Sequence, residues 1–127
     1  MLNNILSVAV GGAIGSVGRY LAVRWIMDRV ITDFPWGTLA VNVFGGLVIG
    51  VVAALFAAYS SLPGELRLFL ITGILGGFTT FSAFSLEVVQ LAVRGAWLAA
   101  LAYIVASVVL AVAGVIAGLQ IVRWVAG

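Results

Sequence analysis

Uncharged residues form four long runs, which cover positions 1–18, 34–64, 68–86 and 95–122. The charged residues that bound these runs are Arg19, Arg24, Asp28, Arg29, Asp33, Glu65, Arg67, Glu87, Arg94 and Arg123. A helix needs about 20 mostly apolar residues to cross the hydrocarbon layer of a membrane. The pattern therefore predicts an all-α membrane protein with four transmembrane helices, in which residues 1–127 form a single transmembrane domain.

Turn-forming residues and charges set the expected helix limits. We predict helices over about 2–27, 36–59, 66–94 and 97–124, joined by connections at 27–37, 60–65 and 94–97. The four tryptophans fall near the ends of these helices, at Trp25, Trp36, Trp97 and Trp124. Tryptophan is enriched where a helix meets the membrane–water interface, so their positions support the predicted spans.

Composition narrows the chemistry that the chain can perform. The sequence is 65% hydrophobic and only 8% charged, whereas an average soluble domain has about 25% charged residues. There is no cysteine, histidine or lysine, which removes thiol chemistry, the commonest general base and Schiff-base lysines. The acidic residues are scattered without an evident pair, so an enzyme is the least favoured class. The sequence has no basic cluster with interleaved aromatic residues, the pattern that would indicate nucleic-acid binding.

The arginines give only a weak signal for membrane orientation. Four spans place both termini on one side, together with Arg67 and Arg123, while Arg24, Arg29 and Arg94 lie on the other side. A difference of two against three barely biases insertion under the positive-inside rule. Insertion in both orientations, and hence an antiparallel homodimer with a two-fold axis in the membrane plane, is as compatible with this count as a fixed topology.

Small residues recur at helical spacing on three of the predicted spans. They are Gly11, Gly15 and Gly18 on the first, Gly46 and Gly50 on the second, and Gly114 and Gly118 on the fourth. Close backbone approach through small residues holds helices together in lipid. These glycines predict tight helix packing and carry no information about a transported substance.

Polar residues inside a span are candidates for function, because burying them in lipid is costly. Arg19 lies deep in the first span and would attract an anion to a water-filled vestibule, unless its long side chain reaches the interface. Thr38 and Asn42 share one helix face, where Asn42 either offers amide hydrogens to an anion or links two helices. Tyr103 and Ser107, also four apart, form a possible hydroxyl track on the fourth span.

The stretch GGFTTFSAFSLE, residues 76–87, is the most informative segment. We expect its glycines and threonines to break the third helix near its middle, which would free backbone carbonyls to bind a cation. Phe78, Phe81 and Phe84 recur every three residues, and hydroxyls such as Ser82 lie between them. Ring edges carry partial positive charge, so rings and hydroxyls together suit a small anion, although ordinary aromatic packing gives the same spacing.

Three of these segments resemble the Fluc (CrcB) family of fluoride channels. They are GGAIGSVGRY (11–20), PWGTLAVNVFGG (35–46) and GILGGFTTFSAFSLE (73–87), and the resemblance covers nearly the whole chain. It implies a passive, fluoride-selective channel in the bacterial inner membrane that lowers fluoride toxicity. It also implies an antiparallel, dual-topology homodimer with two pores at the subunit interface.

The resemblance also implies a role for each candidate residue. The phenylalanines Phe81 and Phe84 and the amide of Asn42 would line the pores, and Arg19 would lie in the vestibule. The polar track would comprise Thr38, Ser82, Glu87, Tyr103 and Ser107. The backbone carbonyls of Gly76 and Thr79, one set from each chain, would bind a structural Na⁺ on the two-fold axis. One departure from the family pattern is Ala83, where a second threonine is usual.

Two other membrane functions compete with this interpretation. A proton-coupled exporter of small drugs can also be a four-helix antiparallel dimer, but it needs a titratable carboxylate in its substrate cavity, and Glu87 is the only acid within a span. A membrane subunit that only assembles with a partner would carry no flux alone.

Overall fold

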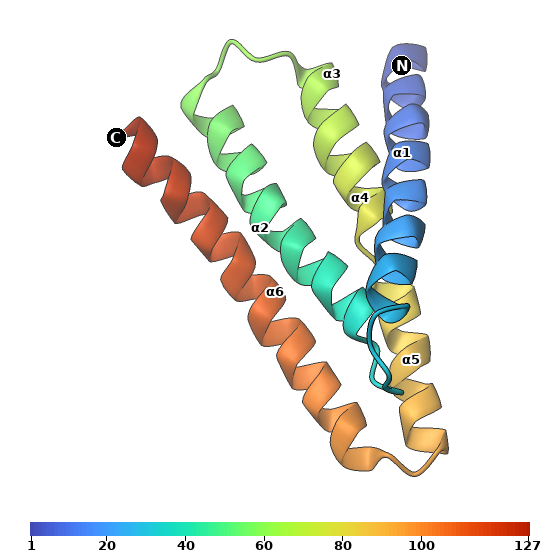
Figure 1. The fold of residues 1–127 in the computed structure, drawn as a ribbon. Helices are drawn as coiled ribbons and strands as arrows, with labels where there is room; N and C mark the ends of the chain where they lie inside the picture. Colours follow the sequence, from blue (N-terminus) through green and yellow to red (C-terminus); the bar gives the residue numbers. More distant parts are fainter.

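The computed structural model describes residues 1–127 and contains the four expected helical spans (Figure 1). In chain order, the elements are α1 (Leu2–Met27), α2 (Trp36–Ala58), α3 (Gly64–Arg67), the π-helix η1 (Leu68–Leu75), α4 (Gly76–Phe78), α5 (Phe81–Val93) and α6 (Trp97–Ala126). The third span, Gly64–Val93, consists of α3, η1, α4 and α5 in succession. All four spans are long and apolar enough to cross a membrane, which confirms the prediction from the uncharged runs.

The spans pack as two pairs that meet at the lower half of the molecule as drawn (Figure 1). Helix α6 lies along α2, and α1 lies along η1 and α4. Helix α5 continues the third span beyond the break and contacts α6. Both termini lie at the same end of the molecule, as an even number of spans requires.

Glycines allow the paired helices to approach closely. A Cβ atom added at Gly46 of α2 would lie 2.7 Å from the Ala111 carbonyl oxygen of α6, and one added at Gly11 of α1 would lie 2.6 Å from the Phe69 carbonyl oxygen of η1. Such contacts are too short for any side chain, so the prediction of tight packing through small residues is confirmed at these positions. Gly18 is different, because an added Cβ there would make only an ordinary contact.

The third span breaks at Thr79 and Thr80. The backbone angles φ and ψ are −89° and 157° at Thr79 and −151° and 124° at Thr80, so both residues are extended. The expectation was that the glycines and threonines together break the helix. The threonines do so, whereas Gly76 and Gly77 remain within α4. Gly77 serves packing instead: a Cβ atom there would lie 2.6 Å from the Gly12 carbonyl oxygen of α1.

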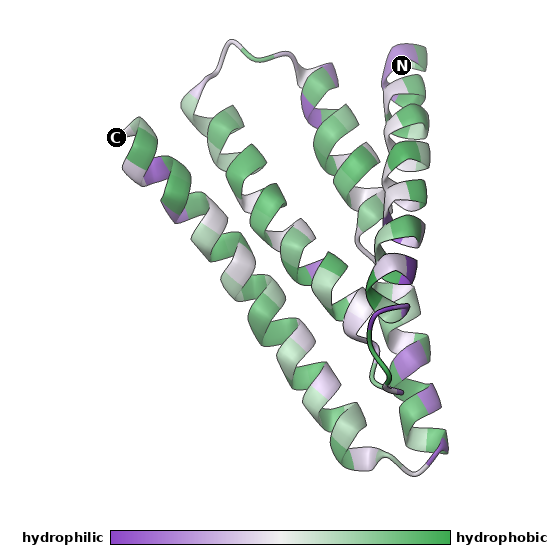
Figure 2. Ribbon diagram, in the orientation of Figure 1, coloured by the Kyte–Doolittle hydropathy of each residue, from purple (hydrophilic) through white to green (hydrophobic).

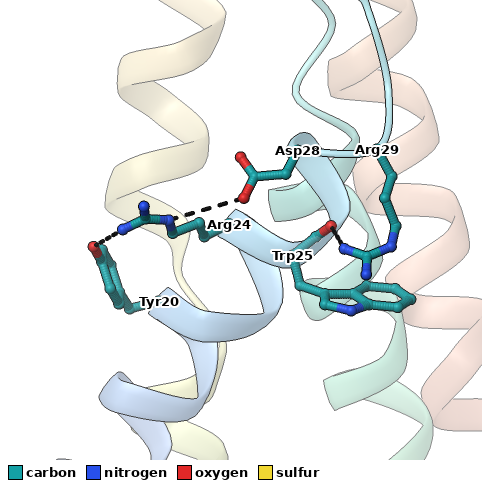
Figure 3. Close-up of polar contacts among 5 residues, drawn as sticks. All are labelled: Tyr20, Arg24, Trp25, Asp28 and Arg29. Carbon is teal, nitrogen blue, oxygen red and sulfur yellow. Dashed lines mark hydrogen bonds and ion pairs between the residues drawn. The ribbon is translucent and has the colours of Figure 1, made fainter.

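The end of α1 carries the features of a membrane-interface anchor (Figure 3). The Arg29 guanidinium lies over the Trp25 ring, 3.9 Å from its centroid, and donates to the Trp25 carbonyl. Arg24 donates to the Tyr20 hydroxyl and lies 3.9 Å from Asp28. Aromatic rings and arginines at a span end place it at the headgroup level. Figure 2 likewise shows hydrophilic residues near the span ends and along α5.

Candidate functional site

The side chain of Asn42 bridges α2 to the break in the third span. Its Oδ1 accepts from the backbone N–H of Thr80 at 2.8 Å, and its Nδ2 donates to the Thr80 carbonyl at 2.9 Å. The break would otherwise leave both backbone groups without a partner in an apolar environment. Asn42 therefore links two helices, and one of its two amide hydrogens remains available.

Thr80 restarts the helix after the break, a role that the sequence analysis did not assign. Its hydroxyl accepts from the Ala83 backbone N–H at 3.0 Å and so caps the first turn of α5. Threonine is a preferred N-cap residue because its oxygen satisfies an otherwise free helix donor. A threonine directly before the resumed helix was the available signal. Thr79 ends the preceding helix, where both its N–H and its hydroxyl donate to the Leu75 carbonyl.

A groove of about 330 Å³ lies beside the break, between α2, α5 and α6. Its lining contains no charged side chain. The lining residues are Asn42, Thr79, Thr80, Phe81, Phe84, Ser107, Val108, Ala111 and Val112. The groove thus brings together four candidates from three helices, namely the amide on α2, the two phenylalanines on α5 and the hydroxyl on α6.

The two phenylalanines of the groove are a pair with unequal exposure. The ring centroids of Phe81 and Phe84 are 5.4 Å apart, yet Phe81 is 77% exposed and Phe84 only 7%. Phe84 also packs edge-on against Tyr103 at 5.0 Å. Phe78 does not extend this pair, because it lies on the other side of the break and packs against Phe44. The expected stripe of three rings is therefore a stripe of two.

Glu87 is the centre of a hydrogen-bonded triad on three helices. Its Oε2 accepts from the Thr38 hydroxyl of α2 at 3.0 Å, and its Oε1 accepts from the Tyr103 hydroxyl of α6 at 3.2 Å. Tyr103 is fully buried, so its hydroxyl requires such a partner. The structure thus joins three predicted members of the polar track in one network, with a carboxylate that accepts from neutral donors alone.

A second cavity, of about 450 Å³, contains Arg19. Arg19 comes from α1 and shares this cavity with Thr38, Thr80, Ala83 and Glu87. The Arg19 Nε atom is buried and has no hydrogen-bond partner within the chain. A buried donor without a partner is uncommon, and this one belongs to a charged group in a cavity large enough for water or an anion. Ser16, one turn before Arg19, also lines the cavity and was not identified from the sequence.

The remaining candidates have different environments. The Ser107 hydroxyl is buried without a hydrogen-bond partner and lines the groove. Ser82 lies on an exposed surface, with its hydroxyl 3.4 Å from that of Thr80, and it lines neither cavity. The helical partners of the Gly76 and Thr79 carbonyls would be the N–H groups of Thr80 and Ala83, which donate instead to the side chains of Asn42 and Thr80. Two free carbonyl oxygens at one helix break are hard ligands suited to a cation such as Na⁺.

Comparison with known proteins relates the whole site to a family. Residues 6–119 match the family model described as CrcB-like protein, Camphor Resistance (CrcB). Proteins named fluoride-specific ion channel FluC are similar over nearly their full length. The one from Nitrobacter winogradskyi is 54% identical, with 94% of each chain covered, and the one from Rhizobium meliloti is 51% identical, with 96% of this chain and 98% of the relative covered. A third, from Rhizobium johnstonii, is 57% identical, with 97% of this chain and 98% of the relative covered. With a family model that spans most of the sequence and relatives of this similarity, the chain belongs to the CrcB/FluC family of fluoride-specific ion channels.

Proposed function

We propose that this protein is a fluoride-selective channel that lets fluoride leave the bacterial cytoplasm passively and so limits fluoride toxicity. The observation that carries the proposal is the uncharged groove at the helix break. It surrounds one space with an amide hydrogen of Asn42, the hydroxyl of Ser107 and the rings of Phe81 and Phe84. Hydrogen-bond donors and ring edges can replace part of the water shell of a small anion, and the absence of a full positive charge allows the ion to leave again.

The pathway continues from the groove into the cavity of Arg19. Thr80 lines both spaces, and the second also contains Thr38 and Glu87, with Tyr103 bonded to the same carboxylate. In this proposal, the fixed charge of Arg19 draws anions into the vestibule, and the hydroxyls form the polar track. Ser82 would join the pathway only if the exposed surface around the break faces a pore.

The functional unit in this proposal is an antiparallel homodimer in which both orientations of the chain coexist. The exposure of Phe81 supports it, because a ring that lines a pore needs a second wall, and a single chain leaves this ring open. The near balance of arginines at the two ends supports insertion in both orientations. A second copy against this face would close the groove and give two equivalent pores.

A structural Na⁺ fits the free carbonyls of Gly76 and Thr79. When bound, the cation would supply positive charge between two anion pathways and satisfy oxygens that otherwise face an apolar environment. These residues hold carbonyl oxygens at the break, and Asn42 fixes the backbone directly after them. Carbonyl oxygens from a second copy would complete the coordination of the ion.

The experiment is fluoride efflux from liposomes that contain the purified protein, followed with a fluoride electrode, with chloride efflux measured in parallel. We expect rapid loss of fluoride without chloride, and a lower rate in Phe81→Ile. Phe44→Ile is the matched control, since this exposed ring lies outside the groove. Fast release of both anions would overturn the proposal that the channel selects fluoride over chloride. Equal rates in the two variants would overturn the role of the groove.

The rival functions predict different results in the same liposomes. A proton-coupled exporter would require a pH gradient for transport, and its transport would be lost in Glu87→Gln. A subunit that only assembles with a partner would release no fluoride even as an intact dimer. Neither has a specific observation in its favour, because Glu87 already accepts two hydrogen bonds and the other acid of a span, Glu65, lies in its first turn.

A further inference from the structure

The cavities of the molecule form a series that extends beyond the residues assigned to the pathway above. The groove and the Arg19 cavity share Thr80. The Arg19 cavity shares Thr38 and Glu87 with a third cavity of about 120 Å³. The third shares Gln90 and Arg94 with an outer hollow along α5. Each shared residue lines two neighbouring spaces, so the cavities succeed one another from the helix break to the end of α5.

The third cavity contains a charged pair at this end of the molecule. Arg94 follows the last residue of α5, and its Nε donates to the Gln90 carbonyl at 3.3 Å. Its NH1 lies 4.0 Å from Oδ1 of Asp33, which belongs to the connection between α1 and α2. Asp33 is 91% exposed and Arg94 52% exposed at their side chains. An exposed pair at this distance is weak and strongly screened, so Asp33 neutralises Arg94 only partly.

Charges of alternating sign therefore follow the series of cavities. Glu87 lines both the cavity that contains Arg19 and Arg24, the latter 3.9 Å from Asp28, and the cavity that contains Arg94. An anion that passes the Thr38–Glu87 hydrogen bond meets a negative charge, and a cation on each side offsets it. Clefts with a fixed charge raise the local concentration of the opposite ion.

We propose that Arg94 is a second anion-attracting residue, which forms the outer mouth of the fluoride pathway, and that Asp33 opposes it. The inference rests on the proposed function, because it concerns the route by which fluoride reaches the vestibule. Arg94 acts on the ion through its electrostatic potential and need not bind it tightly. Removal of its charge should therefore lower flux most when salt does not screen the mouth.

The test compares Arg94→Gln with Arg123→Gln, which removes the same charge from the other end of the chain, where Arg123 lines none of these cavities. Fluoride currents are measured at fixed fluoride in liposomes, at ionic strengths of about 0.01 M and about 1 M set with a large impermeant anion. A unit charge about 7 Å away in water changes ion occupancy on the order of threefold. We expect a loss of that size in Arg94→Gln at low ionic strength, little loss at high ionic strength, and a rise in Asp33→Asn.

Each outcome decides the inference. Equal currents in Arg94→Gln and Arg123→Gln at low ionic strength would overturn it. An equal loss of current in Arg94→Gln at both ionic strengths would also overturn it, because a loss that salt does not screen indicates a structural defect. A decrease in Asp33→Asn would also contradict it. If the parent protein conducts fluoride in the same experiment, such a failure concerns Arg94 alone. If the parent conducts no fluoride, the proposed function fails, and the inference fails with it.

Discussion

Replacement of Asn42 by alanine tests how the helix break is held. The substitution removes two hydrogen bonds of 2.8 and 2.9 Å and leaves the Thr80 N–H and carbonyl without partners in the protein. An unsatisfied buried group costs about 1–3 kcal/mol, whereas hydrogen bonds between membrane helices average about 0.6 kcal/mol. The groove beside Thr80 has room for water, which can partly replace the lost partner. The cost for each of the two backbone groups should therefore lie near the lower end of these values. We expect a loss of about 1–3 kcal/mol in the free energy of unfolding.

The assay is equilibrium unfolding of the purified protein in mixed micelles with increasing SDS, followed by fluorescence of the four tryptophans. Asn4→Ala is the matched control, since this asparagine is exposed at the start of α1 and forms no side-chain hydrogen bond. Fluoride efflux should fall in Asn42→Ala, because both the pore amide and the shape of the break change. The reasoning is refuted if Asn42→Ala unfolds at the same SDS content as Asn4→Ala.

Three further substitutions test packing, capping and proton coupling. Gly46→Ala should destabilise the protein by about 1–3 kcal/mol in the same unfolding assay, because its Cβ would meet the Ala111 carbonyl oxygen. Gly12→Ala is the control and should leave the stability unchanged, because no atom lies near its added Cβ. Thr80→Ala should lower the free energy of unfolding by about 1 kcal/mol, because the α5 cap is lost. Thr80→Ser keeps a capping hydroxyl and should retain most of that stability. Equal effects of the two variants would contradict the capping role. Glu87→Gln should slow fluoride efflux, because the amide has a single acceptor oxygen and its NH2 group can only donate, so one of the two hydrogen bonds from the Thr38 and Tyr103 hydroxyls is lost. The remaining efflux should be the same with and without a pH gradient, and dependence on the gradient in the parent protein would favour the exporter.

The four spans and their limits were predictable from the sequence because they depend on local properties. Hydropathy and length decide whether a segment can cross the membrane, and both are read directly from the uncharged runs. The predicted limits agree with the structure to within two residues; α2, for example, ends at Ala58 rather than Tyr59. The face shared by Thr38 and Asn42 follows in the same way from helical periodicity.

The location of the break required the tertiary structure. Glycine weakens a helix, and the glycines and threonines of residues 76–80 were therefore expected to unwind together. The chain unwinds at the two threonines and not at the glycines, because Asn42 of α2 satisfies the backbone of Thr80 and the Thr80 hydroxyl restarts the helix. The glycine at 77 is needed for contact with α1. A local propensity was overridden by hydrogen bonds from another helix.

The triad of Thr38, Glu87 and Tyr103 and the series of cavities likewise depend on how the helices are rotated and spaced. Glu87 and Tyr103 are 16 residues apart, and Thr38 lies 49 residues before Glu87. Sequence alone identified each as a polar residue in an apolar span, which is a local property. Only the packing of α2, α5 and α6 decided that the hydroxyls of Thr38 and Tyr103 bind the same Glu87 carboxylate, because a hydrogen bond requires its two atoms to lie within about 3 Å.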